Sequence, residues 1–259
     1  MANSNPSAIT PRKFSAINRL LGNNAYQILA QSSVLIVGIG GVGSWAAEAA
    51  ARSAIGRITL ADLDHVAESN INRQIQALDS TVGMAKTEAM KLRIADINAL
   101  CEVTCIEDFL SAENVSDLLA VRFDAVIDCT DQVSAKVAMA LHCAERRIPL
   151  FMAGAAGGRA DPTRVRHADL GATQGDALLA RVRSLLRKSG KFVIQDKAAF
   201  GVGAVFSTEP MRRPGQEACA ADASFQGLSC TGYGSSVCVT AAFGFALAAA
   251  AIDHLLNKQ

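Results

Sequence analysis

The feature that most constrains this chain is a glycine-rich turn that directly follows an uninterrupted apolar run. Residues 34–37 read Val-Leu-Ile-Val, and an apolar run without polar alternation is typical of a buried parallel strand. Residues 38–43 then read Gly-Ile-Gly-Gly-Val-Gly, and a helix of small residues is expected as far as Gly56. Glycine lets backbone N–H groups approach an anion closely at such a turn. The stretch therefore predicts an α/β fold with a nucleotide site at Gly38, Gly40, Gly41 and Gly43.

Polar side chains follow the next predicted strand. Residues 58–60 lead to Asp62, about twenty residues beyond the glycines, where a carboxylate can accept hydrogen bonds from a ribose. Lys86 lies in the first turn of a helix expected over residues 83–97, a placement that opposes the helix dipole and favours an anion nearby. Further polar residues lie between Asp62 and Lys86, and any one of them could simply be a solvated surface residue. Because so many follow one strand, we interpret them as a group that binds the same ligand. The group is Asp62, Asp64, Asn70, Asn72, Arg73, Gln74 and Lys86.

Carboxylates also end the strand expected over residues 124–128. Asp128 and Asp131 lie at its carboxyl end and could hold Mg²⁺ on phosphates, although Asp131 could equally cap the helix expected over residues 133–146. An NAD-dependent oxidoreductase is one alternative function. It would leave Arg73, Lys86 and these carboxylates without a role. A nucleoside triphosphate needs cations and Mg²⁺. The set favours an adenylating enzyme, which steadies the α-phosphorus while a carboxylate attacks and pyrophosphate leaves.

Composition narrows the class further. The chain has 259 residues with a net charge of +1, 50% of them hydrophobic and 19% charged, which predicts a folded protein without a global bias toward nucleic acid. Its seven cysteines, an odd number, and its polar N-terminus favour a reduced, cytoplasmic protein. The sequence has no Cys-x-x-Cys pair and no G-x-x-x-x-G-K-S/T motif, so neither a four-cysteine zinc site nor a P-loop is expected.

Positive charge gathers in the second half of the chain. Residues 159–213 contain eleven Lys or Arg against five Asp or Glu, a local net charge of +6. Part of this segment is expected to be an amphipathic helix. Its apolar stripe is formed by Leu178, Leu179, Val182, Leu185 and Leu186. The basic residues that lie off this stripe are Arg181, Arg183, Arg187 and Lys188. The basic positions are open to two interpretations, a solvated helix face or a surface for RNA phosphates.

Apolar patterning predicts the remaining elements. Strands are expected over residues 102–106, 150–153 and 201–209, a helix over 111–120, and a helical lead-in over 13–30 that breaks near residues 22–24. A final helix over residues 237–252 carries no charge. We interpret it as buried in the fold or at a subunit contact, with membrane association as the alternative, because a bilayer span needs ~20 apolar residues.

Five motifs in order resemble the ubiquitin-activating (E1-like) superfamily, which includes the bacterial ThiF and MoeB adenylyltransferases. They are residues 38–43, 62–64, 69–74, 83–86 and 128–131. The resemblance implies a Rossmann-like, E1-type adenylation fold with a central, mostly parallel sheet flanked by helices. It further implies ATP as ligand, with Asp62 on the ribose, Asn70, Arg73 and Lys86 on the phosphates, and Asp131 on Mg²⁺.

Further motifs resemble one subfamily, the tRNA threonylcarbamoyladenosine dehydratases. These are residues 19–22, 42–48, 70–75, 154–158, 161–163, 206–209 and 240–245. The resemblance implies that ATP activates the carboxylate of the threonylcarbamoyl group on adenosine 37 of tRNA. The side chain's own nitrogen or oxygen then displaces AMP and closes a ring with net loss of water. The substrate would be tRNA and not DNA, and no zinc would be needed.

The resemblance leaves several roles open. Cys230 matches a cysteine of the subfamily and could accept sulfur from a cysteine desulfurase system, or could be a small residue before a helix. In the E1-like superfamily, an arginine near the N-terminus usually reaches the ATP of the partner subunit in the dimer. This sequence has no arginine at the expected spacing, and we predict that Arg19 takes this role in a homodimer. A monovalent cation, Na⁺ or K⁺, beside the site also stays open.

Taken together, we expect one E1-like domain over residues 1–259. It would comprise a helical lead-in (12–31), a nucleotide-binding half (32–158), and a basic, substrate-side and C-terminal half (159–259). Two alternative functions are an adenylyltransferase for a ubiquitin-like sulfur carrier and a non-catalytic sulfur-transfer adaptor acting through Cys230. The first would need a Gly-Gly-ended partner protein.

Overall fold

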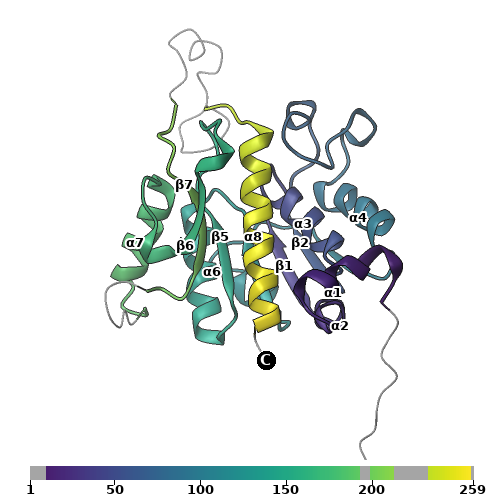
Figure 1. Ribbon diagram of the computed structural model, residues 1–259. Coiled ribbons are helices and arrows are strands. Elements are labelled where there is room, and N and C mark those ends of the chain that lie inside the picture. The colour runs from purple at the N-terminus through teal and green to yellow at the C-terminus, as the bar shows by residue number, and fades with distance from the viewer. Residues whose placement is uncertain (1–9, 193–198, 213–232, 258–259) are drawn as a thin grey trace, which may run out of the picture.

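The computed structural model describes residues 10–192, 199–212 and 233–257. Its centre is a seven-stranded sheet in the order β3-β2-β1-β4-β5-β7-β6, and all neighbouring strands are parallel except β6 and β7 (Figure 1). The strands are β1 (Ser33–Val37), β2 (Arg57–Ala61), β3 (Glu102–Ile106), β4 (Ala125–Asp128), β5 (Leu150–Ala153), β6 (Val165–Asp169) and β7 (Gly203–Ser207). The expectation of a central, mostly parallel sheet flanked by helices is confirmed.

Helices cover both faces of this sheet (Figure 1). They are α1 (Ser15–Leu21), α2 (Ala25–Gln31), α3 (Gly43–Arg52), α4 (Lys86–Ile97), α5 (Val115–Leu118), α6 (Val133–Arg146), α7 (Ala177–Lys188) and α8 (Val237–Asn257). One apolar core joins Val34 and Ile36 of β1 to α3, α4 and α8, and a second joins Leu35 and Val37 to α5, α6 and α7. Because β1 is buried on both faces, its sequence shows no polar alternation.

Several boundaries differ from expectation. Helix α3 ends at Arg52, α4 begins at Lys86, and the helix expected over residues 111–120 is the single turn of α5. Strand β6 was not predicted, because its sequence Val-Arg-His-Ala-Asp carries only a short and polar signal. It is an edge strand that pairs on one side alone, with β7, so it lacks the apolar run of a central strand.

Helix α8 is long and apolar enough by composition to cross a membrane, and it is the one such helix among the described residues. It instead packs along α3 and across the sheet, where Val239, Phe243 and Leu247 are fully buried (Figure 1). A β-carbon at Gly244 would lie 2.5 Å from the Val42 carbonyl oxygen, so glycine lets α8 approach the start of α3. This packing accounts for the buried apolar residues of α8.

Candidate nucleotide-binding site

A pocket of about 370 Å³ opens at the carboxyl edge of the sheet, between β1 and β4. The chain turns outward in opposite directions from these two strands, and parallel sheets bind ligands at such a switch point. The pocket is lined by the segments that follow β1, β2, β3, β4 and β5, and by the start of α8. Lining residues include Gly38, Gly40, Gly41, Asp62, Asp64, Asn70, Arg73, Gln74, Lys86, Thr130, Asp131, Gln132, Ala155 and Thr240.

The glycine turn forms the floor of the pocket. Gly38 has a φ of +85°, and the backbone N–H of Ile39 donates to Asp62 Oδ2 at 2.6 Å. Gly43 does not line the pocket but begins α3 directly beneath the turn. A β-carbon at Gly43 would lie 1.8 Å from the carbonyl oxygen of Gly38, which leaves room only for glycine. The glycines therefore fold the turn tightly enough to present backbone N–H groups at the helix N-terminus.

We expect Gly43→Ala to destabilise the fold by about 1–3 kcal/mol, because the new methyl group forces the turn apart. A matched control is Gly40→Ala, whose β-carbon would meet only the Gln74 Nε2 atom at 4.0 Å. Urea unfolding of both variants and the wild type measures the difference. Equal stability of Gly43→Ala and the wild type would contradict the close contact described here.

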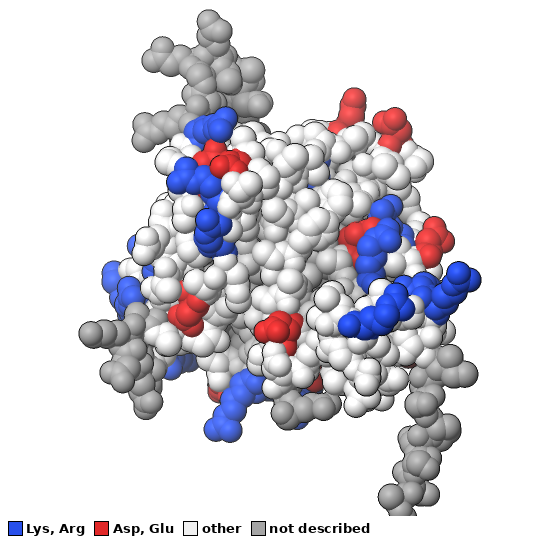
Figure 2. Space-filling model, viewed as in Figure 1, with Lys and Arg blue, Asp and Glu red and all other residues white. Residues whose placement is uncertain are grey.

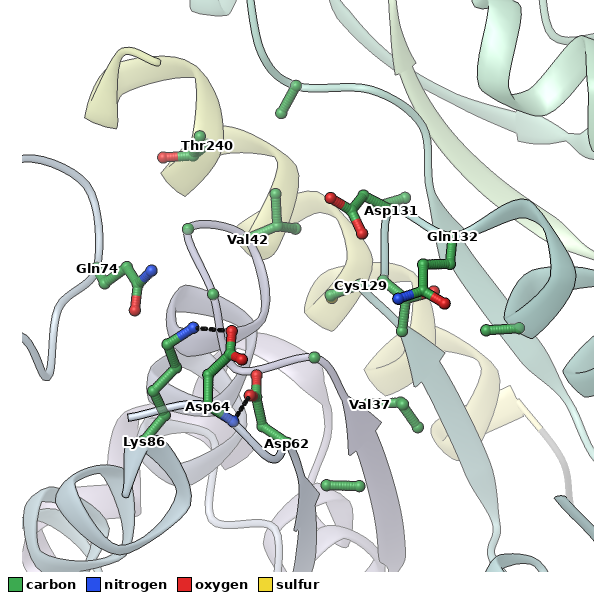
Figure 3. Close-up of a pocket in the computed structure, with 18 of the residues that line it drawn as sticks. Val37, Val42, Asp62, Asp64, Gln74, Lys86, Cys129, Asp131, Gln132 and Thr240 are labelled. Carbon is green, nitrogen blue, oxygen red and sulfur yellow. Dashed lines mark hydrogen bonds and ion pairs between the residues drawn. The ribbon is translucent and has the colours of Figure 1, made fainter. Parts of the chain in front are cut away.

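The wall after β2 combines two carboxylates and a lysine. Lys86 is buried and its Nζ lies 2.7 Å from Asp64 Oδ2, a contact drawn in Figure 3. Asp62 accepts hydrogen bonds from the backbone N–H groups of Ile39 and Asp64. Burial raises the pKa of the Asp62 carboxyl, while the Lys86 ammonium opposes this shift. The lysine predicted from its unfavourable place in the helix thus faces the pocket, where it can neutralise an anion.

The polar loop over residues 69–74 covers the same side of the pocket. Arg73 lines it and donates from Nη1 to the Ser69 carbonyl (2.7 Å) and to Asn72 Oδ1 (2.9 Å). Asn72 does not line the pocket, and its Nδ2 donates to the Ser235 carbonyl at 3.3 Å. Asn70 Oδ1 accepts from the backbone N–H of Ala67. The predicted cluster is brought together, with Asn72 orienting Arg73 rather than facing the cavity.

The opposite wall is the turn after β4. Figure 3 shows Asp131 and Gln132 across the pocket from Lys86 and Asp64. No hydrogen bond or ion pair of Asp131 with another described residue is present, and its side chain is exposed. This free carboxylate fits a Mg²⁺ ion, which typically takes one or two protein carboxylates together with phosphate oxygens and water. Groups of three or more His, Cys, Asp or Glu that could hold a metal are absent from the described residues.

Asp128 differs from the prediction. Its side chain is fully buried, does not line the pocket, and lies 3.2 Å from the equally buried Nζ of Lys136 on α6. Asp128 Oδ1 accepts from the backbone N–H and the hydroxyl of Thr130, at 3.0 and 2.8 Å. Asp128 was expected to contact the ligand, but its buried side chain does not line the pocket. The last side chain of β4 points into the core and not into the pocket. Through its hydrogen bonds to Thr130, Asp128 instead fixes the turn that presents Asp131.

Other expected residues lie away from the pocket or outside the description. Arg19 is exposed on α1, donates to Ser15 Oγ at 3.3 Å, and does not line this pocket. Cys230 lies outside the described residues. Cys129 lines the pocket, and burial is the main cause that raises the pKa of its thiol. Burial likewise raises the pKa of Cys143 to about 12. These two thiols are therefore protonated near neutral pH and are not activated nucleophiles.

Helix α7 forms as expected, with Leu178, Leu179, Val182 and Leu186 buried. Two of its basic residues serve the fold. Arg183 donates to the Thr173 hydroxyl, and the Arg187 guanidinium lies over the Phe200 ring, 5.4 Å from its centroid. The basic stripe of this helix is thus only partly available to a ligand.

Several contributors to the site were not anticipated, among them Thr240, Ser235 and Lys136. Thr240 and Ser235 line it from the C-terminal region, and Lys136 supports it from within the core. No local pattern marks them, because their roles arise from contacts between segments far apart in the sequence. Thr240 lies within a motif that resembles the dehydratase subfamily, which is the one signal that could have pointed to it.

Known proteins resemble the chain over nearly its whole length. The tRNA threonylcarbamoyladenosine dehydratase of Haemophilus influenzae is 43% identical over 250 residues, which cover 96% of this chain and 95% of that protein. Crystal structures of the Escherichia coli tRNA N6-threonylcarbamoyladenosine dehydratase TcdA are similarly close. Its complex with ATP has a TM-score of 0.86 at 41% identity over 95% of both chains. Its complex with AMP has a TM-score of 0.86 at 40% identity over 97% of this chain and 98% of that one.

The family model described as the ThiF family matches residues 14–259, from the helical lead-in to the end of the chain. That span includes the glycine turn, the polar loop, and the turn that carries Asp131. The chain belongs to the ThiF family.

Proposed function

We propose that this chain is an ATP-dependent tRNA-modifying enzyme that acts on the threonylcarbamoyl group of adenosine 37. The observation that carries the proposal is the pocket itself, in which Arg73, Lys86 and Asp131 face one cavity with the glycine turn. A nucleotide with several phosphates needs cations and Mg²⁺ on one side and backbone N–H groups on the other. The similarity to dehydratases that bind ATP and AMP supplies the substrate class.

The reaction has two steps. First, an oxygen of the substrate carboxylate attacks the α-phosphorus of ATP, and pyrophosphate leaves. Next, a nitrogen or oxygen of the same side chain attacks the activated carbonyl carbon, AMP leaves with the original carboxylate oxygen, and a proton is released. The second nucleophile belongs to the substrate, so the protein's task is positioning and charge neutralisation.

The pocket residues divide this task. Asp62, held by two backbone N–H groups, is placed to accept hydrogen bonds from the ribose. Arg73 and Lys86 neutralise the phosphates, with Asn70 and Gln74 beside them. Asp131 would hold Mg²⁺, which when bound withdraws charge from the phosphate oxygens. A monovalent cation, Na⁺ or K⁺, beside the site belongs to the same proposal, and no zinc is required.

The assembly belongs to the same proposal. We infer one domain with a nucleotide-binding half (32–158) and a substrate-side half (159–259), acting in the cytoplasm as a homodimer. In support, Figure 2 shows an uncharged surface over the upper and middle part of α8. Phe245 and Val237 of this helix are exposed. Arg19 would reach the ATP of the partner subunit, and Cys230 could receive sulfur from a cysteine desulfurase system.

The direct test measures AMP release from labelled ATP with tRNA that carries the threonylcarbamoyl group or lacks it. We expect AMP only with the modified tRNA. Pyrophosphate exchange that depends instead on a small Gly-Gly-ended protein would favour the sulfur-carrier alternative. That alternative is weaker, because the similarity to the dehydratases extends over 96% of the chain.

A further inference from the structure

An exposed group of arginines surrounds the turn that leads into β6. Arg164 ends the short helix η4 (Pro162–Arg164), Arg166 lies on β6, and Arg212 follows β7. Arg166 Nη1 donates to the Thr163 carbonyl at 2.8 Å. Hydrogen bonds from Thr163 and the nearby charges of Arg164 and Arg212 hold the pKa of the Asp161 carboxyl below its usual range. The three guanidinium groups thus gather around one turn, and we call them the arginine cluster.

The arginine cluster lies at the same edge of the sheet as the pocket. Val165, which begins β6, pairs with Ser207, which ends β7, and β7 runs parallel to the strands whose carboxyl ends form the pocket. Figure 2 shows basic side chains at this corner, at the upper left of the view. Ala155 and Ala156 line the pocket, and the chain continues from them directly to the turn at Asp161.

Buried contacts fix this segment relative to the pocket. Arg159 Nη1 lies 3.5 Å from Asp176 Oδ2, and both side chains are almost fully buried. Asp176 Oδ2 also accepts from the backbone N–H of Ala155 at 2.9 Å. Glu209 Oε2 accepts from the backbone N–H groups of Ala160 and Asp161, at 2.9 and 2.8 Å. The cluster is therefore held at a defined place on the same edge of the sheet as the pocket.

The carboxylates near the cluster are already engaged. Asp161 Oδ1 accepts from the Thr163 N–H and hydroxyl, while Glu209 binds two backbone N–H groups and Arg212. No salt bridge of Arg164 or Arg166 is found within the described ranges 10–192, 199–212 and 233–257. Exposed guanidinium groups without carboxylate partners suit phosphate oxygens, which they can bind through two parallel hydrogen bonds.

We propose that Arg164 and Arg166 bind the phosphate backbone of the RNA next to the nucleotide that enters the pocket, with Arg212, which is paired with Glu209, adding positive charge beside them. This inference rests on the proposed function, because it assigns the position of that substrate. A carboxylate attached to an RNA base can reach the pocket when the adjoining backbone passes along this edge of the sheet. In protein–DNA complexes, contacts to phosphates fix the register and orientation of the nucleic acid, and the same role is assigned here to the contacts with RNA phosphates.

The test measures the dissociation constant for threonylcarbamoylated tRNA at several salt concentrations. We expect Arg164→Gln with Arg166→Gln to weaken binding by about 10-fold or more for each arginine. The slope of log affinity against log salt should fall by about 1.4, because two single-strand phosphate contacts are lost. ATP binding should be unchanged. The matched control is Arg122→Gln with Arg146→Gln, two exposed arginines outside the cluster, before β4 and at the end of α6.

The outcomes separate this inference from the proposed function. If the wild type binds tRNA and both double variants show its affinity and salt slope, the arginine cluster does not bind the backbone. If the cluster and control variants lose affinity equally, the effect is one of net charge and the inference is also wrong. If the wild type neither binds this tRNA nor releases AMP with it, the proposed function itself fails.

Discussion

Asp131→Asn is expected to lower the rate of AMP formation by about 100- to 1000-fold, a loss of the size found when one group that stabilises developing charge in the transition state is removed. The Asp131 carboxylate is exposed at the pocket wall and has no partner within the described part of the chain, so its change should leave folding intact. Asparagine keeps the shape but lacks the charge that Mg²⁺ requires. Single-turnover AMP formation at saturating ATP measures the effect, and urea unfolding checks the fold.

Arg73→Ala gives an independent reading of the same site. Its guanidinium contacts the Ser69 carbonyl and Asn72 but forms no salt bridge with any described residue, so it is available to phosphates. The rate of AMP formation is expected to fall by a similar factor. Arg73→Lys should have a rate between those of the wild type and Arg73→Ala, because lysine keeps the charge but not the forked geometry. Gln132→Ala, next to Asp131 on the same wall, is the control and should retain most activity. Wild-type AMP rates in both Asp131→Asn and Arg73→Ala would refute the assignment.

Lys136→Met is expected to cost about 3–5 kcal/mol of folding free energy, because it leaves the carboxylate of Asp128 buried without a counter-charge. Both side chains have zero exposure, and Nζ lies 3.2 Å from Oδ2. Asp128 also holds the Thr130 N–H and hydroxyl, so the turn that carries Asp131 should loosen and AMP formation should fall with stability. Urea unfolding measures the first effect.

A double variant separates the ion pair from simple loss of packing. Lys136→Met with Asp128→Asn removes both charges while asparagine still accepts from Thr130, and it should recover most of the stability. Lys91→Met, at a half-exposed lysine on α4, should change stability by less than about 0.5 kcal/mol. If the double variant is as unstable as Lys136→Met alone, the buried charge is not the cause.

Much of the fold follows from local sequence patterns. The strands β1, β3 and β5 and the helix α6 were predicted at or within one residue of their bounds, because apolar runs and helical spacing report burial directly. The pocket residues that follow β1, β2 and β4 could be predicted as well. Each lies at the carboxyl end of a parallel strand, so the topology brings them to one edge.

The remaining features depend on contacts that no local pattern reports. Lys136 reads as an ordinary helix residue, and only the packing of α6 on β4 shows that it is fully buried against Asp128. Thr240 reaches the pocket because α8 approaches the start of α3 at Gly244. The arginine cluster likewise depends on β6, an edge strand whose short polar sequence gave no signal.

In the proposed reaction, the substrate carboxylate is activated by transfer of an adenylyl group in this pocket. The most direct test follows a heavy-oxygen label placed in the carboxylate of threonylcarbamoylated tRNA. We expect one labelled oxygen in the phosphate of the released AMP, and a modified nucleoside that is lighter by one water molecule. Label found in water or inorganic phosphate, with unlabelled AMP, would contradict it.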